Sequence, residues 1–306
     1  MEYSFFLFLL GALATVLLTP LSIRLATAMG AVDIPDGGRH RHARPTPRLG
    51  GLAIVLSLLI CASLLPCEPL VLAWLSGGAL LAALGITDDL FSLSPAVKLI
   101  AEIAIATLPI AFGLAPTHLV LGALSLPLPR PWVGLFCLFY VVLLANAVNL
   151  TDGMDALAAT TCFLSGGTLF LYMHAPAALL FSGTVLGFLP YNRLALSPIG
   201  KEKTLPTRSF LGDTGALFLG YSVALFSLAK PRFSLLLPLV LALPLFDLAR
   251  VFLSRILRGK SPFAADRSHL HHRLADVGMS KGRILLFFFL GSLFFCILFL
   301  LLLGRI

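Results

Sequence analysis

The feature that most constrains this chain is a succession of apolar runs long enough to cross a lipid bilayer. A membrane-spanning helix needs about 20 mostly apolar residues. The 306-residue sequence is 58% hydrophobic and only 12% charged. This composition excludes a soluble globular protein, a disordered chain and a collagen-like repeat. The sequence therefore predicts a multi-pass membrane protein whose spans are joined by short connections.

Ten apolar runs are separated by polar, proline-rich or glycine-rich stretches. They lie at about residues 3–27, 49–66, 69–86, 96–115, 131–149, 155–173, 177–190, 210–229, 232–253 and 283–304. The run at residues 119–128 is too short to span and ends in prolines, so we expect a surface or re-entrant piece there. Alternating segments typical of membrane β-barrels are absent from the sequence. We therefore predict one all-α integral membrane domain, residues 1–306, with about 10 transmembrane helices.

The basic residues predict the orientation, because loops rich in lysine and arginine are retained in the cytoplasm. If the N-terminus faces outward, 18 of the 22 lysines and arginines lie on the inner face. The four on the outer face are Arg130, Lys230, Arg232 and Arg305. Both termini are thus predicted to face outward. This distribution also accounts for most of the formal net charge of +8 without a nucleic-acid partner.

Carboxylates are informative in so apolar a chain, because a charge near the bilayer is costly and usually functional. Of the 14 acidic residues, ten fall on the predicted inner face. Three separate loops bring carboxylates to the membrane surface there: Asp88, Asp89, Asp152, Asp155 and Asp213. Carboxylate and amide oxygens suit a hard cation such as Mg²⁺, and Mg²⁺ in turn suggests phosphate chemistry.

Two further carboxylates, Glu102 and Asp247, fall within predicted spans, and the sequence assigns neither a role. Lys98 precedes Glu102 by four residues, so the two could pair along one helix. Lys98 could equally neutralise a phosphate just above the membrane plane. Both interpretations are open at this point.

Polar residues recur every third position where the fifth run passes into the sixth. If the helix continued, Asn146, Asn149, Asp152 and Asp155 would stack near one face as a row of oxygen ligands. Capping the helix would need one such residue rather than four. The row therefore favours a functional interpretation over a purely structural one.

The tetrapeptide Gly212-Asp213-Thr214-Gly215 precedes the eighth run. Small residues there would let a ligand approach backbone N–H groups, and a helix N-terminus favours bound phosphate. The alternative is an ordinary helix cap by Asp213, which is the better interpretation of the tetrapeptide taken alone.

Two inner loops carry histidines and arginines. The loop at residues 254–283 contains His269, His271 and His272 beside arginines, which fits phosphate or nucleotide recognition better than a zinc site. The basic, proline-containing loop at residues 39–51 returns to the membrane. It either sets topology alone or contributes to the site.

Taken in order, these motifs resemble the polyprenyl-phosphate N-acetylhexosamine-1-phosphate transferases of bacterial membranes, a glycosyltransferase 4 or MraY-like family. The motifs are the P-T-P-R-L-G-G loop, Thr87-Asp88-Asp89, Lys98, N-A-V-N-L-T-D-G-M-D-A-L, Gly187 to Asn192, G-D-T-G and D-R-S-H-L-H-H-R-L. The H-L-H-H ending resembles the WecA/TagO-type branch, whereas the translocase of peptidoglycan synthesis tends to have three consecutive histidines. One departure is Ala156, where the D-G-x-D-G motif of the family has glycine.

The resemblance implies a transmembrane phosphoglycosyltransferase of the bacterial cytoplasmic (inner) membrane with its active site on the cytoplasmic face. Such an enzyme moves N-acetylglucosamine-1-phosphate from UDP-N-acetylglucosamine to undecaprenyl phosphate and releases UMP. It implies Mg²⁺ as cofactor, with Mn²⁺ as a substitute, the lipid bilayer as partner, no nucleic acid, and a homodimer as one arrangement. The alternatives are a phospho-MurNAc-pentapeptide translocase and a multi-pass secondary transporter. The transporter is disfavoured because most carboxylates gather at the inner rim.

The resemblance also implies a role for each matching residue. Asp88, Asp89 and Asp213 would be catalytic, Asn149 and Asp213 would bind the metal, and Lys98 would hold the lipid phosphate. The residues implied in binding the nucleotide sugar or shaping its pocket are Asp152, Asp155, Asn192, Arg267, His269, His271 and His272.

Overall fold

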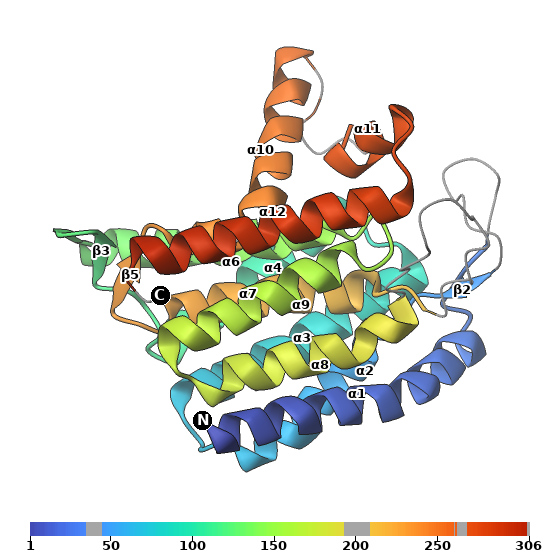
Figure 1. Cartoon of the computed structure of the whole chain (residues 1–306), viewed down its shortest axis with the longest axis horizontal. Coiled ribbons are helices and arrows are strands. Elements are labelled where there is room, and N and C mark those ends of the chain that lie inside the picture. The colour runs from blue at the N-terminus through green and yellow to red at the C-terminus, as the bar shows by residue number, and fades with distance from the viewer. Residues whose placement is uncertain (35–44, 193–208, 260, 262–267, 305–306) are drawn as a thin grey trace.

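The computed structural model of the chain describes residues 1–34, 45–192, 209–259, 261 and 268–304. Parts of the predicted basic loops, at residues 39–44 and 193–208, together with Lys260, Arg267 and Arg305, lie outside these ranges. Long helices lie side by side, and both termini lie at the left end of the bundle in Figure 1, as does strand β3. The short helix α11 and strand β2 lie at the opposite end.

Most of the described residues belong to α-helices. In chain order these are α1 (Glu2–Ala28), α2 (Gly50–Cys61), α3 (Pro69–Phe91), α4 (Pro95–Ile105), α5 (Leu108–Ala111), α6 (Arg130–Thr151), α7 (Leu157–Met173), α8 (Pro176–Asn192), α9 (Gly212–Leu228), α10 (Ala242–Leu257), α11 (Leu270–Asp276) and α12 (Lys281–Leu302). Two 3-10 turns, η1 (Ala62–Leu64) and η2 (Leu237–Leu241), extend α2 and precede α10.

Five helical segments of the described chain are long and apolar enough to cross a membrane. They are Glu2–Ala28, Pro69–Phe91, Arg130–Thr151, Leu237–Leu257 and Lys281–Leu302. The helices α1 and α12 also expose many large apolar side chains, among them Leu17 and Phe294. A soluble protein would not expose apolar faces of this extent, whereas lipid would cover them. The predicted membrane character is confirmed, while the count of ten spans stays a prediction.

The chain is mostly helical, as the all-α expectation requires, and two small sheets accompany the helices in the described residues. Strands β1 (Val32–Asp33) and β2 (Thr46–Pro47) pair antiparallel, and so do β3 (His118–Leu121) and β4 (Leu124–Pro127). Strand β5 (Arg232–Ser234) joins β3 in parallel, with Leu119 opposite Phe233. The short run at 119–128 is therefore a surface hairpin. Residues 232–241, predicted to begin the ninth span, instead form β5 and η2, and the helix itself begins at Ala242.

Helix α9 lies at the centre of the molecule, where it packs against α2, α3, α6 and α7. Its residues from Thr214 to Leu228 are all buried. A Cβ on Gly51 would overlap the backbone of Gly215, and one on Gly85 would overlap that of Thr214. Glycine is therefore required where α2 and α3 approach the first turn of α9, which fixes that turn in place.

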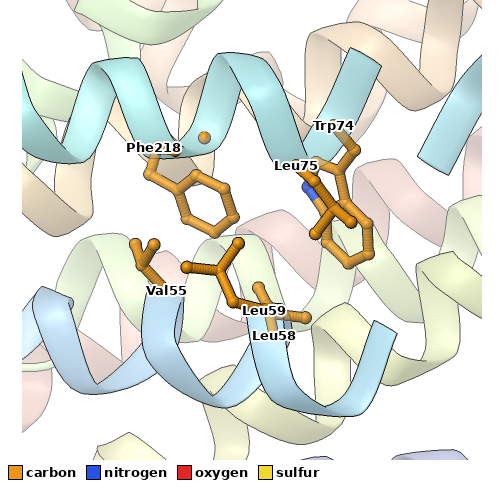
Figure 2. Close-up of a pocket in the computed structure, with 8 residues that line it drawn as sticks. Val55, Leu58, Leu59, Trp74, Leu75 and Phe218 are labelled. Carbon is orange, nitrogen blue, oxygen red and sulfur yellow. The ribbon is translucent and has the colours of Figure 1, made fainter. Parts of the chain in front are cut away.

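Farther along α9, aromatic packing fills the space between helices. The Trp74 ring stacks on Phe218, with ring centroids 6.3 Å apart, and its Nε1 donates to Ser222 Oγ at 2.8 Å. Figure 2 shows a cavity beside this stack that Val55 and Leu58 also line, of only about 10 Å³. A void of this size is a packing gap between α2, α3 and α9 and not a ligand site.

Candidate active site

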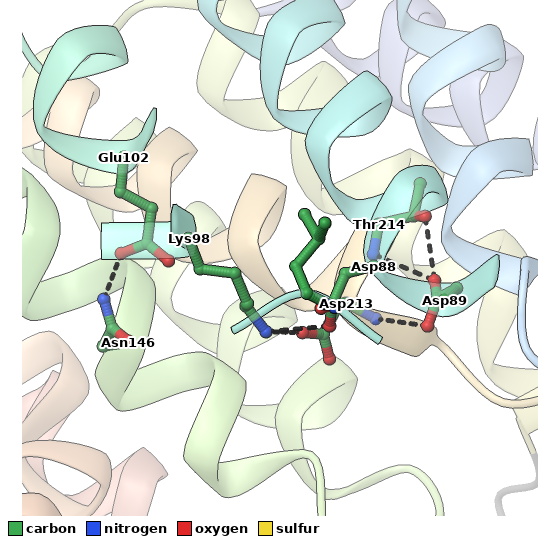
Figure 3. Close-up of polar contacts among 8 residues, drawn as sticks. Asp88, Asp89, Lys98, Glu102, Asn146, Asp213 and Thr214 are labelled. Atoms are coloured by element: carbon green, nitrogen blue, oxygen red, sulfur yellow. Dashed lines mark hydrogen bonds and ion pairs between the residues drawn. The ribbon is translucent and has the colours of Figure 1, made fainter. Parts of the chain in front are cut away.

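Three side chains from three helices meet in the close-up of Figure 3. Lys98 of α4 donates a hydrogen bond to Asp88 Oδ2 at 2.9 Å and another to Asp213 Oδ2. Asp88 belongs to the last turn of α3, and Asp213 to the first turn of α9. The structure thus brings together the predicted lipid-phosphate lysine and two of the predicted catalytic carboxylates.

The α3–α4 turn determines how Lys98 reaches Asp88. Helix α3 ends at Phe91, and the next residue, Ser92, has a left-handed backbone with φ of 51°. Ser94 then caps α4 by accepting the Val97 N–H, and Pro95 supplies the fixed φ that suits a first helical residue. The two helices are separated by only three residues, so the end of one faces the start of the other.

Asp89, the neighbour of Asp88, turns toward the N-terminus of α9. Its carboxylate accepts from Thr214 Oγ1 at 3.0 Å and from the backbone N–H groups of Asp213 and Thr214 at 3.3 and 3.4 Å. These are donors that a helix leaves unsatisfied in its first turn. Asp89 therefore fastens α9 to α3, and the predicted N-cap role of Asp213 falls to Asp89 instead.

Gly212 has a conformation that only glycine adopts easily. Its φ is +71°, and a Cβ there would overlap the Arg48 carbonyl oxygen. Arg48 in turn pairs with Asp33, which ties this turn to strand β1. The glycines of the tetrapeptide thus allow close packing of protein against protein, whereas the sequence suggested close approach of a ligand.

The predicted row of polar residues at the end of α6 does not form one common face, because its members have different partners. Asn146 donates to Glu102 of α4, which is 3% exposed, and Asn149 lies beside Asp213. The helix stops at Thr151, so Asp152 and the following residues leave the common face. The Lys98–Glu102 pair, one of two interpretations that the sequence left open, does not form among the described residues, because Lys98 bonds to Asp88 and Asp213 instead.

Asp152 follows the last residue of α6 and lies among other carboxylates. Burial raises the pKa of Asp152 well above its usual range, and the negative charges of Asp213, Asp155 and Asp89 raise it further. Such crowding of acidic groups favours a bound cation. Asp155 also lies 3.8 Å from Lys281 Nζ at the start of α12.

Ala156, the departure from the family motif, has a left-handed backbone with φ of 62°. This is the conformation that a glycine would adopt without strain, which explains the glycine of the motif. The Ala156 N–H donates to Asn192 Oδ1 at 2.9 Å, and Asn192 Nδ2 donates to Ser209 O at 3.1 Å. Asn192 is 1% exposed, and its two hydrogen bonds join the start of α7 to the segment before α9.

The predicted histidine cluster lies on or next to α11. His269 precedes the helix, and its ring centroid is 6.0 Å from that of His271, which is 4.2 Å from that of His272. His271 is buried, and a Cβ on Gly153 would overlap its ring. The cluster is therefore next to the turn that contains Asp152. Arg267 lies outside the described residues.

The donor set fits magnesium better than zinc. Among the described residues, no three His, Cys, Asp or Glu side chains are grouped as a metal site. Magnesium commonly takes only one or two protein oxygens and completes its shell with water and substrate phosphates. Asp213 and Asn149, which lie next to each other, are such a pair.

Sequence reasoning missed Thr214, Arg250 and the contacts of Asp247. Thr214 pairs with Asp89, and Asp247 accepts hydrogen bonds from Arg250 and from the start of α11. Only the location of Asp247 inside an apolar run signalled its importance.

The fold and the site together define a class of protein. It is a multi-pass membrane protein that carries a site of carboxylates and a lysine at one end of its helices. Residues 71–230 match the model of glycosyl transferase family 4. The chain belongs to this family.

Three relatives illustrate the similarity. A probable undecaprenyl-phosphate N-acetylglucosaminyl 1-phosphate transferase of Bacillus subtilis is 32% identical, with 94% of this chain and 82% of the relative covered. A decaprenyl-phosphate N-acetylglucosaminephosphotransferase of Mycobacterium tuberculosis is 30% identical, with 87% and 74% covered. An undecaprenyl-phosphate alpha-N-acetylglucosaminyl 1-phosphate transferase of Escherichia coli is 25% identical, with 84% and 72% covered.

Proposed function

We propose that this protein transfers N-acetylglucosamine-1-phosphate from UDP-N-acetylglucosamine to undecaprenyl phosphate and releases UMP. The proposal rests on the position of Lys98, which bonds to both Asp88 and Asp213. Three further carboxylates, Asp89, Asp152 and Asp155, lie near this pair. A cation between acidic groups can exchange its carboxylate partners for a phosphate. The names of the relatives supply the reaction, donor and acceptor.

In the proposed reaction, an oxygen of the lipid phosphate attacks the β-phosphorus of the donor. A new phosphorus–oxygen bond forms, and the bond from the β-phosphorus to the bridging oxygen breaks. The leaving UMP takes that bonding pair. A lipid phosphate is largely ionised near neutral pH, so Asp88 is proposed to orient it more than to remove a proton. Catalysis then depends chiefly on alignment and charge neutralisation.

Lys98 is proposed to hold the acceptor phosphate. Its ammonium group comes from α4, at the same end of the bundle as Asp213. A lysine provides a point charge with three donors, so it can contact a phosphate and still keep one carboxylate partner.

Mg²⁺ is the proposed cofactor, with Mn²⁺ able to replace it. Asp213 and Asn149 would hold it, and the bound ion would offset the charge of the donor diphosphate. The remaining carboxylates, Asp152 and Asp155, are proposed to line the nucleotide-sugar pocket together with His271 and His272.

A two-step alternative would use a carboxylate as nucleophile and form a covalent phosphosugar enzyme. We propose the direct reaction. Incubating the protein with labelled donor alone separates the two schemes. The direct reaction predicts no labelled protein and no exchange of UMP without acceptor. Labelled protein, or UMP exchange without acceptor, would contradict it.

We also propose ten spans, both termini outside, and an active site at the cytoplasmic face of the bacterial inner membrane. The two termini lie at the end of the bundle opposite α11, which supports this arrangement (Figure 1). A cysteine introduced at Pro45, an exposed position, should react with a membrane-impermeant reagent only from the cytoplasmic side. Labelling only from outside would overturn the orientation.

The proposed transfer is tested by following the donor's β-phosphate. Purified protein receives UDP-N-acetylglucosamine labelled at that phosphate, undecaprenyl phosphate and Mg²⁺. The proposal predicts label in an undecaprenyl-linked product, whereas label only in water-soluble products would contradict it. Parallel reactions with UDP-N-acetylgalactosamine and UDP-MurNAc-pentapeptide test the donor, and a strong preference for the latter would favour a translocase.

A further inference from the structure

Asp247 is a buried carboxylate to which the proposed reaction assigns no part. It lies in α10, is 4% exposed and falls within a segment long enough to span a membrane. Its Oδ1 accepts from the Leu270 N–H at 2.8 Å and from Arg250 at 2.7 Å. Its Oδ2 lies 3.0 Å from His269 Nδ1. A buried charge is costly, and here two of its three contacts hold the start of α11.

Arg250 strengthens the same attachment. One turn after Asp247 on α10, its guanidinium also donates to the Ser268 carbonyl oxygen. The three consecutive residues 268–270 are thus each bonded to α10, through a carbonyl, a ring nitrogen and a backbone N–H. The segment enters α11 in a single orientation.

Helix α11 needs this attachment, because it is only seven residues long. A helix this short is not stable alone in water. Its position therefore depends on contacts made by neighbouring segments. His271 is carried along with it, buried against Gly153 and next to Asp152. A change at Asp247 that shifts α11 would therefore also shift the contact between His271 and Gly153.

The pairing also sets the hydrogen-bonding capacity of His269. A carboxylate only accepts hydrogen bonds, so Nδ1 must carry the proton shared with Asp247. The other ring nitrogen, Nε2, is then the atom left for a ligand, and the ring has one orientation. In metalloenzymes, carboxylates that lie behind metal-binding histidines orient those histidines in this way.

We infer that Asp247 is a positioning residue for the nucleotide sugar, acting through His269 and the start of α11. The inference rests on the proposed function, in which His271 and His272 line the nucleotide-sugar pocket, and it adds His269 to that pocket. Asp247 touches neither substrate. Its loss should weaken donor binding and leave acceptor binding unchanged.

The test uses Asp247→Asn, His269→Gln and the double variant in the full-length protein. Asparagine keeps the shape of Asp247 but donates toward Nδ1, which moves the ring proton to Nε2. We expect Asp247→Asn to raise KM for UDP-N-acetylglucosamine about tenfold and to change KM for undecaprenyl phosphate less than about twofold. In the His269→Gln background the same change should have little further effect. Equal changes in both KM values, or additive effects, would overturn the inference.

Ser165→Ala is the matched control for lost stability. Ser165 donates to the Val240 carbonyl oxygen at 2.7 Å, is fully buried, and supports η2 just before α10. The control should lower the thermal unfolding midpoint and leave both KM values unchanged. A control that raised the donor KM as strongly as Asp247→Asn would show that the effect is general destabilisation.

Amide hydrogen exchange provides a readout that does not need activity. Asp247→Ala should accelerate exchange at Leu270 and its neighbours in α11 at least about tenfold, because the bond to Oδ1 is lost. Exchange in α12 should be unchanged. Unaltered exchange in α11 would overturn the inference.

The two proposals can fail separately. If the wild type formed no UMP, the proposed function would fail, and hydrogen exchange would still test how α11 is attached to α10. If the wild type were active and Asp247→Asn kept its donor KM, the inference alone would fail.

Discussion

Lys98 Nζ lies 2.9 Å from Asp88 Oδ2, joining the start of α4 to the end of α3. The same ammonium group donates to Asp213 of α9, so one side chain links three helices. Under the proposed function, a phosphate bound to Lys98 would replace one of these carboxylates. The released carboxylate would then be available to a cation.

Lys98→Ala is expected to raise the apparent KM for undecaprenyl phosphate by about 10- to 100-fold, as expected for one charge-assisted hydrogen bond. The KM for UDP-N-acetylglucosamine should change far less. Steady-state kinetics with each substrate varied in turn measure both. Lys230→Ala, at the far end of α9, is the control and should alter neither. Equal effects on both substrates would count against the proposed role.

Asp213→Asn is expected to lower kcat by about 10²- to 10³-fold, because it removes a charged group that aligns the reacting phosphates. The Mg²⁺ concentration for half-maximal activity should rise, since a neutral amide binds the ion more weakly. Titrating Mg²⁺ against activity measures this. Asp276→Asn, exposed on α11, should behave like the wild type. Full activity with unchanged magnesium dependence in Asp213→Asn would exclude the metal assignment.

Ala156→Gly should stabilise the protein by about 1 kcal/mol, because a left-handed backbone costs an alanine about that much. Ala158→Gly, two residues later inside α7, should destabilise it by a similar amount. Thermal unfolding of both variants under identical conditions compares them. Opposite signs of the two shifts are the expected result, and two destabilised variants would show that the strain at Ala156 is negligible.

Much of the site could be predicted from the sequence, because its residues are scarce polar groups in an apolar chain. Asp88, Lys98, Asn149 and Asp213 were all expected at one end of the helices, and the structure brings them together. The helices themselves follow apolar runs that sequence alone reveals.

What could not be predicted depends on contacts between distant segments. The i, i+4 spacing suggested a Lys98–Glu102 pair, but the burial of Glu102 against α6 gives it Asn146 as partner. Likewise, periodicity extended a helix through Asp152, whereas α6 ends at Thr151. Strand β5 has only three residues and is stabilised by β3, which lies more than 100 residues earlier in the sequence.

Stability at low pH should depend on His271. Burial, together with the charges of His272 and His269, lowers the pKa of His271 from 6.5 to about 3. Below pH 6.5 the unfolded chain binds a proton that the folded protein does not. Stability is therefore complete above pH 6.5 and falls toward pH 3, by at most about 1.4 kcal/mol per pH unit.

His271→Gln should remove this contribution. The loss in thermal unfolding midpoint between pH 7 and pH 5 should then be smaller than in the wild type. His174→Gln, at an exposed position after α7, is the control and should keep the wild-type dependence. The same loss in His271→Gln as in the wild type would show that His271 is protonated in the folded protein.

The most direct measurement of the central claim is UMP release by the purified protein under four conditions. UDP-N-acetylglucosamine is present in all four, with undecaprenyl phosphate and Mg²⁺ each supplied or withheld. UMP is expected only when undecaprenyl phosphate and Mg²⁺ are both present, in an amount equal to the undecaprenyl-linked sugar phosphate formed. UMP release without the lipid acceptor, or none under any condition, would contradict it.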